Sequence, residues 1–128
     1  MNDMEMMKSL KQVFMEKTVQ RIVLRLLRNE MLIIPPHEKS FLVTLEELNT
    51  LWRKQLHRRY PVLTFHIFIT TLITIVTNFQ KQIRYKYATS YFSDAEWEQI
   101  ESKDIPHMWE SVVERSIEYV LVTFNNWL

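Results

Sequence analysis

Glycine is absent from all 128 residues of this chain, and its absence constrains the fold more than any other sequence feature. A chain of this length and average composition would carry about nine glycines. Glycine supplies the positive φ angles of tight hairpin turns and the close backbone approach that phosphate-binding loops need. The sequence therefore predicts an all-α fold, with helix ends closed by Asn, Pro or side chains. The Walker A loop, the dinucleotide-binding fingerprint and the glycine-rich ATP loop are all excluded.

Length and composition favour a single domain. Chains of this length usually fold as one domain, and an apolar content of 47% is enough for a sizeable core. Cysteine is absent, which excludes disulfides, thiolate metal sites and cysteine nucleophiles and fits a cytoplasmic protein. The net charge of +1 gives no overall attraction to nucleic acid or anionic lipid. We expect one all-α domain over residues 1–128, a compact bundle of five to six helices.

The first helical pattern covers residues 3–29 and changes phase near Lys17. The change indicates either a bend or a loosely attached N-terminal arm formed by residues 1–15. Pro35 and Pro36 then exclude a continuing helix. The opening MNDMEMMKSLKQ carries acidic residues and lacks the apolar run of a signal peptide.

Further helix boundaries follow from capping sequences and prolines. Three helix starts are predicted, at Thr44 with Glu47, at Ser93 with Glu96, and at Asp104 before Pro106. The second of the long helices should end near Tyr60, and Pro61 is well suited to begin the next one. The last helix runs to the C-terminus.

Residues 61 to about 89 form the most apolar segment of the chain. Its many β-branched residues favour a strand, but the spacing of its apolar residues is helical. One side of that helix carries Phe65, Ile69, Leu72, Val76, Phe79 and Ile83. The segment is short for a membrane span and rich in threonine, so we expect a central helix covered by its neighbours.

Two interpretations of this helix remain open. Arg58 and Arg59 precede it and His66 lies within it. In the first interpretation, Arg58 and Arg59 complement the negative end of the preceding helix, and the apolar side chains fill an ordinary hydrophobic core. In the second, the helix lines a pocket for a fatty-acid-like anion whose carboxylate is bound at the mouth by Arg58, Arg59 and His66. The apolar lining would then be Phe65, Phe68, Ile69, Leu72, Ile73 and Val76.

The sequence contains no pattern that indicates catalysis or metal binding. The four histidines are scattered, and a nucleophile elbow cannot form without glycine. A basic stripe at helical spacing comprises Lys17, Arg21, Arg25 and Arg28. It is either the solvated face of an amphipathic helix or a partner-binding face. The second interpretation would make the chain a small phage- or plasmid-encoded regulator that binds nucleic acid or a host protein.

The segment LEELNTLWRKQL and the closing helix MWESVVERSIEYVLVTF, together with the length and helix count, resemble the non-haem globin-like sensor domains of bacilli. These include stand-alone sporulation-inhibitory proteins that resemble the sensor domain of a sporulation histidine kinase. The resemblance implies a globin-like bundle without haem, a fatty-acid-like ligand in an apolar tunnel, a halide in a polar chamber, and a homodimer. It also implies a cytoplasmic, non-catalytic regulator that inhibits sporulation by competing with the kinase.

Overall fold

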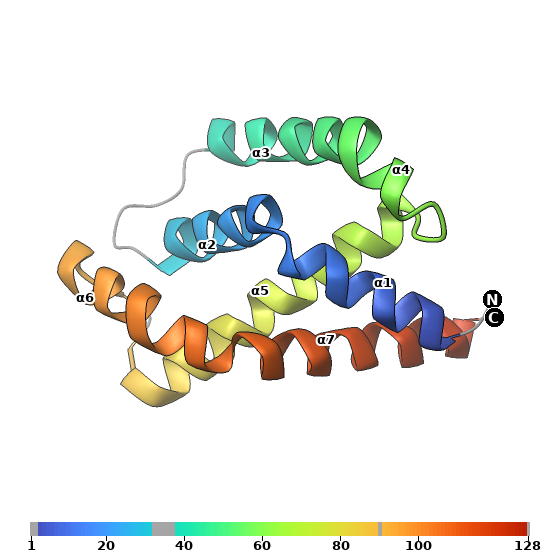
Figure 1. The fold of residues 1–128 in the computed structure, drawn as a ribbon. Helices are drawn as coiled ribbons and strands as arrows, with labels where there is room; N and C mark the ends of the chain where they lie inside the picture. Colours follow the sequence, from blue (N-terminus) through green and yellow to red (C-terminus); the bar gives the residue numbers. More distant parts are fainter. Residues whose placement is uncertain (1–2, 32–37, 90, 128) are drawn as a thin grey trace.

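The computed structural model describes the backbone of residues 3–31, 38–89 and 91–127, and within it the side chains of residues 4–29, 45–89 and 91–124. The fold is all-α, as predicted (Figure 1). The α-helices are α1 (Asp3–Met15), α2 (Lys17–Met31), α3 (Glu38–Leu51), α4 (His57–Arg59), α5 (Phe65–Tyr87), α6 (Asp94–Gln99) and α7 (Ile105–Trp127). Two π-helical segments, η1 (Trp52–Leu56) and η2 (Ile100–Asp104), connect α3 to α4 and α6 to α7.

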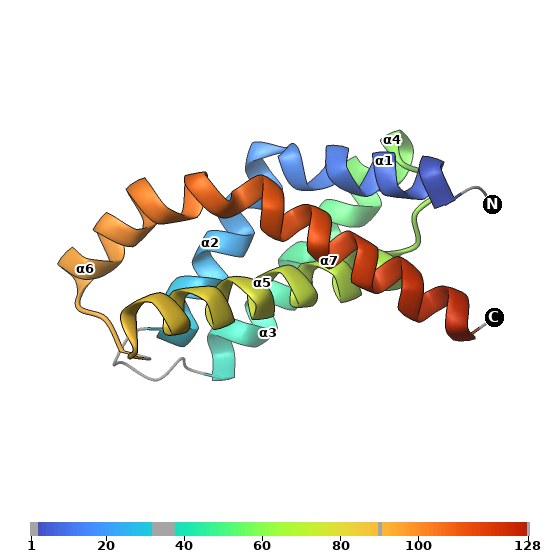
Figure 2. The same cartoon turned by 90° about the horizontal axis from the view of Figure 1, so that it is seen from below.

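The two longest helices, α5 and α7, pack against each other and run antiparallel (Figures 1 and 2). The ring centroids of His66 and Phe124 are 5.6 Å apart, and those of Phe79 and Trp109 are 5.3 Å apart, so residue numbers rise along one helix as they fall along the other. Helix α1 packs on α7, and α2 packs on α5. One buried apolar cluster draws side chains from every one of these helices.

The N-terminal segment bends rather than forming a loose arm. Glu16 separates α1 from α2, at the position where the apolar pattern changes phase. Leu10, Val13 and Phe14 are fully buried, and α1 packs along α7. The loosely attached arm over residues 1–15 was therefore a wrong expectation for the described part of α1. Pro35 and Pro36 lie outside the described residues.

Two predicted helix starts need correction. Helix α3 already begins at Glu38, so Thr44 lies inside it and does not start it. Helix α5 begins at Phe65, because the Thr64 hydroxyl accepts a hydrogen bond from the Ile67 amide at 3.1 Å and satisfies one of the free donors of the first turn. Pro61 lies instead in the preceding turn. The prediction of a helix over the apolar segment is confirmed, and among the described helices none is long and apolar enough to cross a membrane.

The second capping box is confirmed. The third start signal is confirmed in position, since α7 begins at Ile105 with Pro106 in its first turn, but the predicted capping role of Asp104 is wrong. Ser93 and Glu96 exchange side-chain-to-backbone hydrogen bonds at the start of α6. Asp104, in contrast, lies within a continuous helical path from α6 through η2 into α7 (Figure 2). The Ile105 amide bonds to the Ile100 carbonyl across the wide π-helical turn. Because proline lacks an amide proton and crowds the preceding turn, this widening accommodates Pro106 without ending the helix.

The Asp104 carboxylate binds a different helix instead of capping its own. It accepts hydrogen bonds from the Lys86 ammonium at 2.8 Å and from the Tyr87 hydroxyl. These contacts, with the Lys86 hydrogen bond as the largest influence, lower the pKa of Asp104 from its usual 3.8. They join the end of α5 to η2.

The lowered pKa gives a pH-dependent prediction. Because the folded pKa of Asp104 lies below the unfolded value, its contribution to stability is complete above about pH 4 and is lost as the pH falls through the folded pKa. Asp104→Asn should therefore be less stable than the wild type at neutral pH, and the difference should shrink in strong acid. Urea unfolding of both proteins at several pH values measures this. A difference that does not depend on pH would contradict the assignment.

Helix α5 ends on an alanine in a conformation that usually requires glycine. Ala88 has φ 54° and ψ 26°, and its amide donates to the Arg84 carbonyl at 2.8 Å. The left-handed region costs a residue with a Cβ about 1–2 kcal/mol, so the absence of glycine leaves strain at this helix end. The expectation that Asn, Pro or side chains close the helix ends does not hold here.

Ala88→Gly should therefore stabilise the protein by about 1 kcal/mol, after allowance for the greater entropy of glycine in the unfolded chain. Ala95 is a matched control, because it is exposed within α6. Ala95→Gly should destabilise by about 1 kcal/mol. Chemical denaturation measures both changes, and equal shifts in the two variants would contradict the strain at Ala88.

Candidate ligand-binding groove

The predicted apolar pocket lining lies mostly in the packed core. Phe68 is fully buried, and its ring stacks on Trp52 at 5.1 Å and on Phe14 at 5.8 Å between centroids. Leu72 and Val76 are also buried. The other two inward members of the set, Phe65 and Ile69, are half-buried and pack against the same cluster. These side chains therefore pack on protein atoms of α1, η1 and α5.

The residues predicted at the pocket mouth have other neighbours. Arg59 forms an ion pair with Glu16 at 3.0 Å, and the Tyr60 hydroxyl donates to the same carboxylate at 3.1 Å. Burial, followed by the hydrogen bond to Glu16, raises the pKa of Tyr60. Arg58 is exposed on α4. His66 is exposed on α5, and its ring packs nearly perpendicular to the Phe124 ring on α7. Arg59 thus contacts the bend between α1 and α2, whereas His66 contacts α7.

Ile73, the remaining predicted pocket residue, lines an open groove between α5 and α7. Its side chain is 58% exposed. The groove has a volume of about 360 Å³, in the range of small-molecule sites. Its lining consists of Ile73, Thr74, Thr77, Asn78, Lys81, Arg115 and Tyr119. The lining thus contains two cations and no carboxylate.

Hydrogen bonds fix the polar floor of this groove. The Asn78 side-chain amide donates to the Ser116 hydroxyl at 2.9 Å, and that hydroxyl donates to the Val112 carbonyl at 2.7 Å. Ser116 is fully buried, so this contact joins α5 and α7 beneath the groove. The Thr74 hydroxyl donates to the Thr70 carbonyl at 2.8 Å. The floor is therefore held in place before any ligand binds.

The groove is cationic at one end and apolar at the other. Lys81 follows Asn78 by three residues, which is about 4.5 Å along α5, and Arg115 directly precedes Ser116. Because α5 and α7 are antiparallel, these positions lie in the same direction from the Asn78–Ser116 contact. Ile73 and Tyr119 lie in the opposite direction. An anion with an apolar tail would match this arrangement.

Intramolecular ion pairs occupy half of the basic stripe on α2. Arg25 bonds to Glu47 at 2.7 Å, and Arg28 bonds to Asp94 at 3.0 Å. Lys17 and Arg21 are exposed. The stripe therefore presents less uncompensated charge than its sequence indicates.

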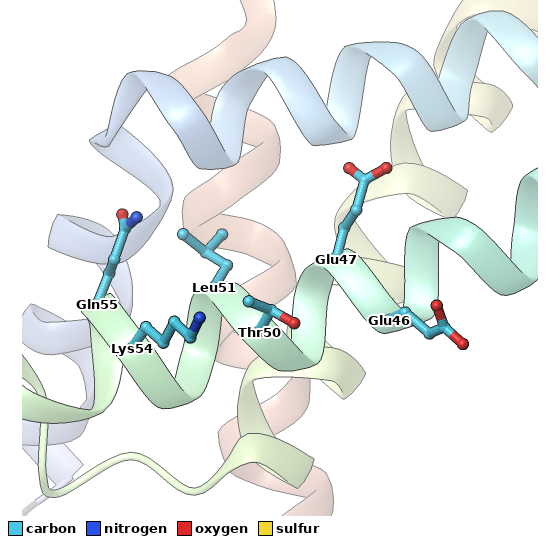
Figure 3. Close-up of a pocket in the computed structure, with 6 residues that line it drawn as sticks. All are labelled: Glu46, Glu47, Thr50, Leu51, Lys54 and Gln55. Carbon is cyan, nitrogen blue, oxygen red and sulfur yellow. The ribbon is translucent and has the colours of Figure 1, made fainter.

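Two further depressions adjoin α3, and both combine cations with carboxylates. One has a volume of about 330 Å³ and is lined by Thr18, Arg21, Ile22, Arg25, Glu47 and Leu51. The other is about 410 Å³ and is lined by Glu46, Glu47, Thr50, Leu51, Lys54 and Gln55 (Figure 3). The carboxylates offset the attraction that the cations would exert on an anion. Among the described residues, no three metal-ligating side chains come together.

Sequence reasoning identified Ile73 but missed the cations of the groove. One available signal was that α5 contains Lys81, Arg84 and Lys86 but no acidic residue. The contribution of Arg115 could not be recognised without the pairing of α5 with α7. Comparisons of the chain with protein-family models, with curated proteins and with solved structures find no match.

Proposed function

We propose that this protein is a non-catalytic sensor or regulatory module that binds an amphipathic anion in the groove between α5 and α7. The observation that carries the proposal is the pair of cations, Lys81 and Arg115, in a groove without carboxylates and beside Ile73 and Tyr119. The proposal moves the ligand from the sequence-predicted tunnel to the surface of the same helix. It keeps the predicted ligand class, an apolar chain with an anionic head group.

The energetics of such a ligand have two parts. Charge-assisted hydrogen bonds to Lys81 and Arg115 orient the head group. Each methylene that leaves water against Ile73 and Tyr119 contributes up to about 0.8 kcal/mol. An open groove covers only one side of the ligand's apolar tail, so we expect micromolar rather than nanomolar affinity.

The resemblance to bacillar sensor domains supports the biological part of the proposal. A stand-alone module of this kind would act in the cytoplasm as a homodimer and modulate a histidine kinase pathway, inhibiting sporulation by competing with the kinase. The exposed apolar side chains of Tyr119 and Val122 on α7 give a partner a surface to contact beside the groove. Ligand binding there would alter that surface directly.

The proposal is tested by titrating the delipidated protein with dodecanoate and following backbone amide signals by NMR. Saturable shifts should concentrate at Thr77, Asn78, Lys81, Arg115 and Tyr119. Native mass spectrometry of freshly purified protein should in addition show a retained amphiphile. Shifts concentrated around Arg58, Arg59 and His66 would favour the sequence-predicted mouth instead. No binding at millimolar dodecanoate, or a salt-dependent complex with duplex DNA that requires Arg21, would contradict the proposal.

A further inference from the structure

We infer that the head group preferred by the α5–α7 groove is a phosphate monoester dianion rather than a carboxylate. This inference rests on the proposed function, because it specifies the ligand class of the same site. It follows from the charge, the donor groups and the direction of the groove.

Charge is the first argument. Five cations form ion pairs with carboxylates in the described structure: Lys11, Arg25, Arg28, Arg59 and Lys86. Lys81 and Arg115 line a groove whose other lining residues are all uncharged. Two positive charges in one groove match a head group that carries about two negative charges at neutral pH. A carboxylate would balance only one of them.

Donor groups give the second argument. Arg115 presents a planar fork that suits bidentate contact with phosphate, and Lys81 supplies a compact ammonium. Thr77, next to Asn78, adds a hydroxyl group to the lining. A phosphate monoester has three terminal oxygens to accept from these donors, whereas a carboxylate has two. Asn78 is already bonded to Ser116, so it fixes the floor beneath the head group.

Reach and direction give the third argument. Lys81 and Arg115 both start within about one helical turn of the Asn78–Ser116 contact, and both have long side chains that can converge on one anion. The ester oxygen can then point towards Ile73 and Tyr119, at the apolar end. Val122, which is 59% exposed, follows Tyr119 by three residues on α7 and can extend the apolar surface for the tail.

The test compares three ligands with the same twelve-carbon tail: dodecyl phosphate, dodecyl methyl phosphate and dodecanoate. Calorimetry is done on the full chain, below the micelle concentration of each ligand. Dodecyl phosphate should bind about tenfold more tightly than the other two, because they carry one negative charge fewer. Methylation of the phosphate isolates charge, since the tail and the phosphorus centre stay the same.

Substitutions of the groove cations test whether the preference for dodecyl phosphate arises in the groove. Lys81→Gln and Arg115→Gln should each remove most of the preference for dodecyl phosphate while leaving dodecanoate binding weaker but measurable. Arg115→Lys keeps the charge but loses the fork, and should give an intermediate preference. Lys103→Gln, which removes an exposed cation of η2 outside the groove lining, is the control and should change nothing.

The outcomes separate the two proposals. Equal affinity for all three ligands, lost in the groove variants, would overturn the phosphate inference and leave the proposed function intact. A phosphate preference that survives both Lys81→Gln and Arg115→Gln would also overturn the inference. Absence of binding by all three ligands would contradict the proposed function itself. Circular dichroism of each variant confirms that loss of binding is not loss of folding.

Discussion

Phe68→Ala should destabilise the protein by about 4 kcal/mol, because it removes the central ring of a closed aromatic stack. The Phe68 ring is fully buried between Trp52 and Phe14. Truncation removes apolar transfer energy and leaves a cavity that rigid helices on both sides cannot fill. A loss of this size is a large part of the stability of a typical domain, so the variant should unfold at much lower denaturant concentration.

The matched control is Tyr85→Ala, which truncates an aromatic side chain of the same helix that is 91% exposed. Its stability should change by less than about 0.5 kcal/mol. Equilibrium unfolding in urea measures both variants. A loss of about 1 kcal/mol or less for Phe68→Ala would mean that the ring lines an open tunnel, as in the sequence-based interpretation, rather than a packed core.

The sequence was most informative where one local pattern dominates. The apolar spacing of residues 65–83 identified α5 as a helix despite its β-branched residues, since one face must be buried whatever its neighbours are. Ser93 and Glu96 form a capping box within one helical turn, so it can be predicted without knowledge of the tertiary structure. The phase change near Lys17 marked the bend at Glu16 for the same reason.

Predictions of how helix ends are closed were wrong where a distant contact competes with the local signal or where no local signal exists. Asp104 before Pro106 has the sequence of a helix start, but its carboxylate is bound by Lys86 and Tyr87 of α5. Ala88 could not have been recognised as a left-handed helix end, because alanine carries no sequence signal for that conformation. The Asp104 case is decided by how the end of α5 meets η2.

The candidate site was predicted only in part for a similar reason. The predicted apolar lining, Ile73 included, comes from a single helix, and its periodicity carries no information about the neighbouring helices. Whether an apolar side chain of α5 faces the core or the groove depends on where α7 packs. Only the antiparallel pairing of α5 with α7 brings Lys81 to the same groove as Arg115.

Removing both groove cations should have the largest effect on binding. In Lys81→Gln/Arg115→Gln, the affinity for dodecanoate should fall about 30-fold, which corresponds to about 1 kcal/mol for each charge-assisted contact at a solvent-exposed site. The substitutions remove no packing contact from the hydrophobic core, because both residues line the open groove. The free energy of unfolding should therefore change by less than about 1 kcal/mol.

The double variant also separates the groove from the basic stripe of α2. Lys17→Gln/Arg21→Gln removes the same number of charges from exposed positions outside the groove. This matched variant should bind dodecanoate as the wild type does. If it lost affinity equally, the effect would come from the overall charge of the protein and not from a site.

The most direct measurement of the central claim is calorimetric titration of dodecanoate into the wild-type protein and into Lys81→Gln/Arg115→Gln. We predict saturable binding of one ligand per chain to the wild type and an affinity about 30-fold lower for the variant. Equal affinities for the two proteins, or no binding to the wild type, would contradict a ligand site between α5 and α7.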